Sequence, residues 1–266
     1  MKALPFFSVI VPTHKRARLL RRALQSIRSQ ASPVPFEVIV VSDVVDAATD
    51  AVCAEILTDT DIYVRRNGMP GPSESRNLAL KLAKGSYLLF LDDDDAWHAG
   101  CLEQLYAQPA VKRGEPVYFN CSVVKERRHA DGPEQLSEVG VDLAGCLTEG
   151  VFVKNQVHMS CFALPRPLLE GLAFDASMRA YEDWDFLLSV FSRQMPVHVP
   201  FLGSRIFEVD DESSDRRGSS KQANDYNAVL DYLYVYRRHA APQPALKQQR
   251  VELLQACGLT LTQELL

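Results

Sequence analysis

A run of acidic residues directly follows a short apolar segment in the N-terminal half of the chain. Four consecutive carboxylates, Asp92 to Asp95, come after Leu88–Leu91, which is short enough to be a buried strand. Four like charges repel one another, so a fold keeps them together only where a solvated turn or a divalent metal compensates the charge. Mg²⁺ or Mn²⁺ held by one or two carboxylates usually completes its shell with water and substrate phosphate. The cluster therefore predicts a metal–diphosphate site, and an acidic surface loop that binds nothing is the alternative.

Alternating strands and helices are expected to position this cluster. The predicted strands are Phe7–Val11, Phe36–Val41, Ile62–Val64 and Ser86–Leu91, and the predicted helices cover 19–27, 49–57 and 73–83. This order indicates an α/β fold of right-handed βαβ units, with a mostly parallel sheet flanked by helices. Such sheets bind ligands beyond the carboxyl ends of their strands, where the acidic cluster falls. No Gly-x-Gly-x-x-Gly follows the first strand, so a dinucleotide fingerprint is absent.

The second half of the chain is less regular. Its predicted elements are strands at 117–124 and 159–164, a polar turn at 127–133, and helices over 181–194, 222–239 and 245–257. Glu182 and Asp183 open the first of these helices, where acidic side chains complement the positive end of the helix dipole. The stretch Asp210–Lys221 is charged or small throughout, and we expect either an inert linker or a mobile lid carrying Arg216 and Arg217.

Composition excludes several classes of protein. A net charge of −5 gives no support for nucleic-acid binding, and no apolar run is long enough to span a bilayer. The N-terminus lacks a signal-peptide pattern, and six scattered cysteines without Cys-x-x-Cys pairing indicate reduced thiols in a cytoplasmic protein. Basic residues of the first helix, including Arg16 and Arg22, are expected to form a solvated face, with attraction to an anionic membrane or substrate as the alternative.

Five ordered segments carry a family resemblance. They are Val9–Thr13, Val40–Asp43, Gly71–Ala79, Ala83–Trp97 and Tyr181–Asp185. Together they resemble the inverting family 2 glycosyltransferases of GT-A fold. The resemblance implies a GT-A domain over 1–209, with a nucleotide-binding half at 1–97 and an acceptor-side half at 98–209. A mobile loop at 210–221 and a C-terminal helical extension at 222–266 complete the expected organisation.

The resemblance also implies roles for residues that contact the nucleotide. Pro12 and Thr13 are expected to lie against the nucleotide at the end of the first strand. Asp43 is expected to accept a hydrogen bond from the base, as uracil N3–H would donate. Arg76 is expected near the base or the phosphates.

The acidic residues receive the remaining roles by the same resemblance. Asp92 or Asp93 is expected to reach the ribose, and Asp94, in the Asp-x-Asp pattern, to bind the metal. Asp183 matches the general base, with Glu182 as the alternative. A carboxylate in that role takes the proton from the acceptor hydroxyl during a direct, inverting displacement.

Two departures from the family pattern affect this transfer of roles. The family usually continues past its second strand as Asp-Gly-Ser, whereas Val44-Val45-Asp46 follows Asp43 here. A histidine often assists the metal in relatives, but the corresponding segment Ser204–Glu208 contains none. A third protein ligand for the metal therefore cannot be assigned from the sequence.

The sequence thus predicts a Mn²⁺- or Mg²⁺-dependent inverting glycosyltransferase. A UDP-sugar is the favoured donor, and the acceptor is a hydroxyl of a glycan or lipid-linked molecule, in cell-surface polysaccharide synthesis. The expected location is cytoplasmic, with peripheral association at the inner face of the membrane as a further possibility. Alternatives are an inactive sugar-nucleotide-binding module and a phosphatase with an aspartate nucleophile. The phosphatase pattern usually follows the first strand and has Thr or Val where Ala96 stands. A nucleotidyltransferase would need a Gly-rich loop after that strand.

Overall fold

Strand β1 (Phe7–Thr13) is buried along its whole length and lies inside the N-terminal half of the sheet. It pairs in parallel with β2 (Phe36–Ser42) and β4 (Tyr87–Phe90), and β2 pairs in parallel with β3 (Ile62–Arg65). These are the four strands that the apolar runs predict. The computed structural model describes residues 4–129, 132–178, 180–209 and 226–262.

Beyond β4 the sheet becomes mixed. Strand β8 (Phe162–Pro165) pairs antiparallel with β4, and the order continues through β6 (Val117–Arg128), β9 (Val197–Val209) and β5 (Ala96–Trp97). Strand β7 (Pro133–Val141) pairs antiparallel with β6 off this path. The α/β fold with flanking helices is therefore confirmed. The parallel pairs are those among β1–β4 and the pair of β6 with β9.

Two predictions for this second half were wrong in detail. The predicted polar turn at 127–133 begins too early, because β6 continues to Arg128. The strand predicted at 159–164 starts later, since a 3₁₀ turn, η2 (Met159–Cys161), precedes β8. Strand β7 was not predicted, because its largely exposed residues mix polar and apolar types and form a strand only through the ladder with β6.

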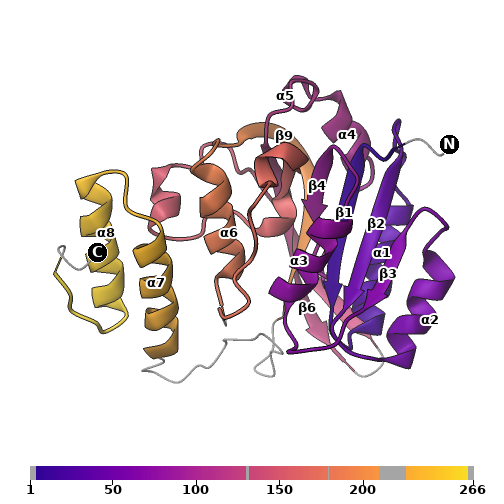
Figure 1. Cartoon of the computed structure of the whole chain (residues 1–266), viewed down its shortest axis with the longest axis horizontal. Coiled ribbons are helices and arrows are strands. Elements are labelled where there is room, and N and C mark those ends of the chain that lie inside the picture. Colours follow the sequence, from indigo (N-terminus) through magenta and orange to yellow (C-terminus); the bar gives the residue numbers. More distant parts are fainter. Residues whose placement is uncertain (1–3, 130–131, 179, 210–225, 263–266) are drawn as a thin grey trace.

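Helices cover both faces of the sheet (Figure 1). Those on one face are α1 (Ala17–Arg28), α2 (Ala47–Ile56), α4 (Cys101–Ala107) and α5 (Pro109–Lys112). On the other face lie α3 (Pro72–Leu82) and α6 (Glu182–Phe191), and α7 (Tyr226–Arg238) and α8 (Pro244–Ala256) follow on the outer side of α6. Short 3₁₀ turns η1 (Glu149–Phe152) and η3 (Arg166–Leu169) lie in the connections. None of the described helices combines the length and the apolar character that a membrane crossing requires.

Helices α7 and α8 stand beyond α6, at the end of the molecule away from α2 (Figure 1). Trp184 of α6 packs against Tyr232 and Tyr236 of α7, with ring centroids 5.6 and 6.0 Å apart. The buried Asp185 carboxylate accepts from His239 Nε2 at 2.9 Å and pairs with Arg238 Nε at 3.1 Å. These contacts attach the C-terminal helices to α6, whose first turn carries the predicted base. The predicted lid, Asp210–Lys221 with Arg216 and Arg217, lies outside the described residues.

Gly85 lies where the connection from α3 to β4 crosses β1. Its backbone N–H donates to Ser8 Oγ at 2.8 Å, and that hydroxyl donates to Glu37 Oε1 at 2.6 Å. Glu37 also accepts from the Lys84 N–H at 2.7 Å. A Cβ at Gly85 would lie 2.6 Å from the Ser8 backbone nitrogen. Glycine is therefore required by close approach of two backbone segments.

Replacing Gly85 by alanine is expected to lower the free energy of unfolding by about 1–3 kcal/mol, the usual cost of overpacking a filled interior. Urea denaturation followed by circular dichroism measures the change. Gly140→Ala is the matched control, because a Cβ there would meet only Leu202, at 3.9 Å and beyond. Equal losses of stability in the two variants would contradict the close-approach explanation.

Candidate active site

A cavity of about 710 Å³ lies beyond the carboxyl ends of β1, β2 and β4. Eight of the nine predicted site residues line it, namely Pro12, Thr13, Asp43, Arg76, Asp92, Asp93, Asp94 and Glu182. The ninth, Asp183, is adjacent to Glu182 in the first turn of α6. Residues from the ends of three strands and from two helices are thus brought to one place, as the carboxyl edge of a parallel sheet allows.

Arg76 joins the acidic cluster to the start of α6. This buried guanidinium donates to Asp92 Oδ1 at 2.7 Å and to Glu182 Oε1 at 2.9 Å. Burial alone would raise the pKa of Asp92, but the charges of Arg76 and His158 outweigh it, so the pKa is lowered. Burial has the larger effect on Glu182 and raises the pKa of that carboxyl. Arg76 therefore keeps Asp92 ionised and fixes its position relative to α6.

Asp93 and Asp94 differ in their surroundings although they are neighbours. Asp93 is buried, accepts a hydrogen bond from Thr13 Oγ1 at 2.7 Å and pairs with Arg16 at 3.2 Å. Burial raises the pKa of Asp93 to about 6. Asp94 is more exposed, and its carboxylate pairs with Arg16 at 3.2 Å and Arg128 at 3.4 Å. Asp94 is thus bound by cations on two sides.

The expectation of a solvated basic face is wrong for Arg16 and Arg22. Arg16 pairs with the acidic cluster, and Arg22 donates to Glu126 at 2.6 Å and to the carbonyl of Asp94. Arg128 falls in the region predicted as a polar turn. Because α1 follows β1 directly, its first turns lie at the same sheet edge as the acidic cluster. This order of elements was the sequence signal that would have placed Arg16 and Arg22 near the aspartates.

His158 is a site residue that the sequence did not reveal. Asp92, Asp95 and His158 each offer one possible ligand atom, and these three atoms lie within 4.8 Å of one another. Asp95 is buried, accepts from Ser160 Oγ at 2.9 Å and from the Phe207 N–H at 3.1 Å, and burial raises its pKa to about 7. Among the described residues, this group could hold a metal ion, and it does not include Asp94.

The acidic residues around His158 change the pKa of its imidazole. Burial alone would lower the pKa of His158, but the carboxylates of Asp95 and Asp92 outweigh it and raise the pKa. His158 precedes η2 and its Nδ1 accepts from the Ser160 N–H at 3.3 Å. A histidine next to an apolar run was the available sequence signal, but nothing in the sequence linked it to the distant acidic cluster.

The loop after β2 directs Asp43 into the cavity despite its unusual sequence. Asp43 contacts His14 Nδ1 through one carboxylate oxygen and accepts from the Gly71 N–H at 2.7 Å through the other. Asp46 instead caps α2, accepting from the Thr49 N–H at 2.9 Å. The two aspartates of this loop therefore have separate functions.

A strained residue precedes the acidic pair of α6. Tyr181 has a φ of 62°, a left-handed conformation that side-chain-bearing residues adopt at a cost of about 1–3 kcal/mol. Its ring packs 4.8 Å from Tyr232 and 6.0 Å from Trp184, measured between centroids. Asp183 accepts from the Trp184 N–H at 2.8 Å and forms no ion pair with any cation of the described chain. Contacts with α7 thus hold the turn that orients Glu182 and Asp183.

Comparison with known proteins identifies the family. The family model described as glycosyl transferase family 2 matches residues 8–135. The GalNAc(5)-diNAcBac-PP-undecaprenol beta-1,3-glucosyltransferase of Campylobacter jejuni is 30% identical over 234 residues, covering 86% of this chain and 72% of that protein.

Two solved structures show the same fold. TarS 1–349 of S. aureus in complex with UDP-GlcNAc is 19% identical with a TM-score of 0.61, over 93% of this chain and 71% of that one. The mannosyltransferase PcManGT of Pyrobaculum calidifontis, in complex with GDP-Man and Mn²⁺, is 18% identical with a TM-score of 0.59, over 97% and 74%. These likenesses confirm the predicted GT-A fold. Together with the family match and the 30% identical relative, they show that the chain is a glycosyltransferase and belongs to glycosyl transferase family 2.

Proposed function

We propose that this glycosyltransferase moves a sugar from a nucleotide diphosphate to a hydroxyl group, inverts the anomeric centre and requires Mn²⁺ or Mg²⁺. The observation that carries the proposal is the convergence of eight predicted residues on one cavity beyond the strand ends. A UDP-sugar is the favoured donor, and a solved structure of the same fold in complex with UDP-GlcNAc supports that choice. Family membership removes the phosphatase alternative. A measurement of turnover with a nucleotide sugar would distinguish an active enzyme from an inactive binding module.

The acceptor is proposed to be a glycan, free or lipid-linked. The Campylobacter relative is named for action on an undecaprenol-diphosphate-linked glycan, which supports the lipid-linked form. An enzyme with such an acceptor works at a membrane surface. Peripheral association with the inner face of the membrane is therefore part of the proposal.

Asp43, Thr13 and Pro12 are proposed to contact the nucleotide. Both carboxylate oxygens of Asp43 already have partners, in His14 and the Gly71 N–H, but a carboxylate can accept about four hydrogen bonds. The Asp43 carboxylate therefore has a further acceptor position, which could take the hydrogen bond from the N3–H of uracil. The Thr13 hydroxyl orients Asp93 at the same edge, next to the proposed ribose position.

The donor atoms at Asp92, Asp95 and His158 suit a divalent ion. Carboxylate oxygens are ligands for Mg²⁺ and Mn²⁺, and the imidazole nitrogen makes the set more suitable for Mn²⁺ than for Mg²⁺. A bound ion would offset the negative charge that grows on the leaving diphosphate. The family resemblance instead assigns the metal to Asp94, and that role stays a prediction. In the structure the Asp94 carboxylate pairs with Arg16 and Arg128.

Asp183 is proposed as the general base. Inversion by direct displacement needs one carboxylate to take the proton of the acceptor hydroxyl. Glu182 is bound to Arg76, whereas Asp183 forms no ion pair with the described cations. Arg76 therefore holds the Glu182 carboxylate in place, whereas the described cations leave the Asp183 carboxylate open to an acceptor hydroxyl.

Metal dependence is tested by comparing two variants. His158→Ala is expected to weaken Mn²⁺-dependent UDP binding by more than about tenfold, the lower limit for loss of an outer-shell partner. Asp94→Ala tests the prediction from the sequence in the same assay. Calorimetry of UDP with Mn²⁺ and with EDTA measures both, and His98→Ala, which lines neither described cavity, is the control. UDP affinity that does not change with EDTA would refute the metal requirement.

Asp183→Asn keeps the shape of the side chain but cannot accept a proton. Turnover of a UDP-sugar is expected to fall by about 10²–10⁴-fold, the usual contribution of a general base. UDP affinity, measured by calorimetry, should remain, because the proposed base faces the acceptor. If Glu182→Gln loses turnover while Asp183→Asn keeps it, the two roles are reversed.

A further inference from the structure

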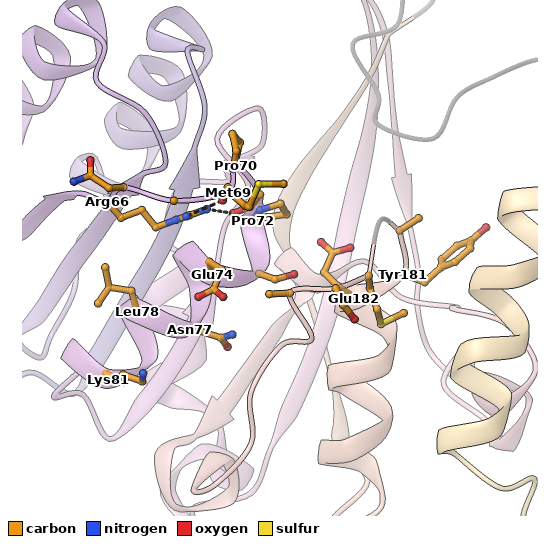
Figure 2. Close-up of a pocket in the computed structure, with 18 of the residues that line it drawn as sticks. Arg66, Met69, Pro70, Pro72, Glu74, Asn77, Leu78, Lys81, Tyr181 and Glu182 are labelled. Carbon is orange, nitrogen blue, oxygen red and sulfur yellow. Dashed lines mark hydrogen bonds between the residues drawn. The ribbon is translucent and has the colours of Figure 1, made fainter.

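A second, larger cavity of about 1420 Å³ lies between α3 and the segment before α6 (Figure 2). Glu74, Asn77, Leu78 and Lys81 come from α3, and Glu182 lies across from them. We propose that this cavity is the acceptor site and that it takes an uncharged saccharide. The inference rests on the proposed function, since it names the second substrate of the same reaction.

The position of the cavity relative to the acidic pair is the first argument. It shares Gly71, Pro72 and Glu182 with the smaller cavity, so the two spaces meet at the start of α6. A donor in the smaller cavity and an acceptor in the larger one would approach each other at this shared wall. Glu182 lines both cavities, and Asp183, the proposed base, is the next residue in the chain.

The charge of the walls is the second argument. All three guanidinium nitrogens of Arg66 donate within the protein, to Ser75 Oγ at 2.9 Å, Met69 O at 2.9 Å and Gly71 O at 2.7 Å. Among the described lining residues, three carboxylates face two cations, and Lys81 is the cation without an ion pair to a described residue. A phosphate or carboxylate group needs cationic donors that are available to it. The excess of carboxylates over cations among the described lining residues therefore disfavours an anionic acceptor group.

The mixture of side chains is the third argument. Met69, Leu78 and Met178 provide apolar surface, whereas Glu74 and Lys81 provide exposed polar groups. Asn77 is fixed, because its amide exchanges two hydrogen bonds of 2.8 Å with the backbone of Phe174. A sugar ring presents both C–H faces and hydroxyl groups, so it matches such a surface. The volume exceeds the roughly 300–1,000 Å³ of a typical small-molecule pocket, which leaves room for more than one sugar unit.

The test separates transfer from hydrolysis of the donor. Glu74→Trp would fill the cavity from an exposed position in the first turn of α3. UDP release from UDP-glucose and UDP-GlcNAc with Mn²⁺ is measured alone and with methyl glycosides of glucose, galactose, N-acetylglucosamine and N-acetylgalactosamine. Glucuronate and glucose 6-phosphate are the anionic comparison. The neutral glycosides should increase the rate of UDP release. In Glu74→Trp this increase should be at least about tenfold smaller, because the indole excludes the acceptor sterically.

Glu103→Trp is the matched control, because Glu103 is also exposed in the first turn of its helix, α4, and lines neither described cavity. Hydrolysis without acceptor and UDP affinity should stay within about twofold of wild type in both variants, as expected for changes outside the donor site. The inference is overturned if Glu74→Trp keeps the increase, if only the anionic compounds give one, or if no saccharide does. A wild-type protein that neither binds UDP nor releases it refutes the proposed function itself.

Discussion

The buried ion pairs of Arg76 are the interaction on which the rest of the site depends. One guanidinium links Asp92 at the end of β4 to Glu182 at the start of α6, and its own position is set by α3. Removing one partner of a buried pair costs about 3–5 kcal/mol, because the other charge is left without compensation. Arg76 therefore connects the carboxyl end of β4 to the start of α6, and loss of its charge would disturb both.

Cations from separate elements explain how adjacent aspartates can coexist and still differ. Arg16 from α1 and Arg128 from β6 pair with Asp94, while Asp95 is surrounded by hydrogen bonds from Ser160 and Phe207. The charges of Arg76 and His158 lower the pKa of Asp92, whereas burial raises the pKa of Asp95, so the same residue type differs according to its burial and its partners. What looks like a repeat in the sequence is a set of distinct groups in the folded protein.

The N-terminal strands and the acidic cluster could be predicted because their signals are local. Apolar runs such as Val38–Val41 predict buried strands wherever they pair, and Asp92 directly follows one. Strand β7 and His158 could not be predicted from local signals. An exposed strand of mixed residues forms only through pairing with its neighbour, and the acidic partners of His158 are distant in the sequence. Arg16 was misread for a related reason: a charge on a helix is assigned to solvent unless the position of the helix end is known. The domain division at residue 209 and the roles of single site residues stay predictions.

Gly71, Pro72 and Glu182 belong to the walls of both cavities, whereas Glu74 and Lys81 belong to the larger one alone. A substitution at one of these shared residues alters both cavities at once, so evolution cannot change one cavity there without affecting the other. The outer face of α3 has no such restriction. Substitutions along that face can therefore change the proposed acceptor cavity while the proposed nucleotide cavity keeps its residues, which makes the outer face of α3 a suitable place to exchange residues when the enzyme is redesigned.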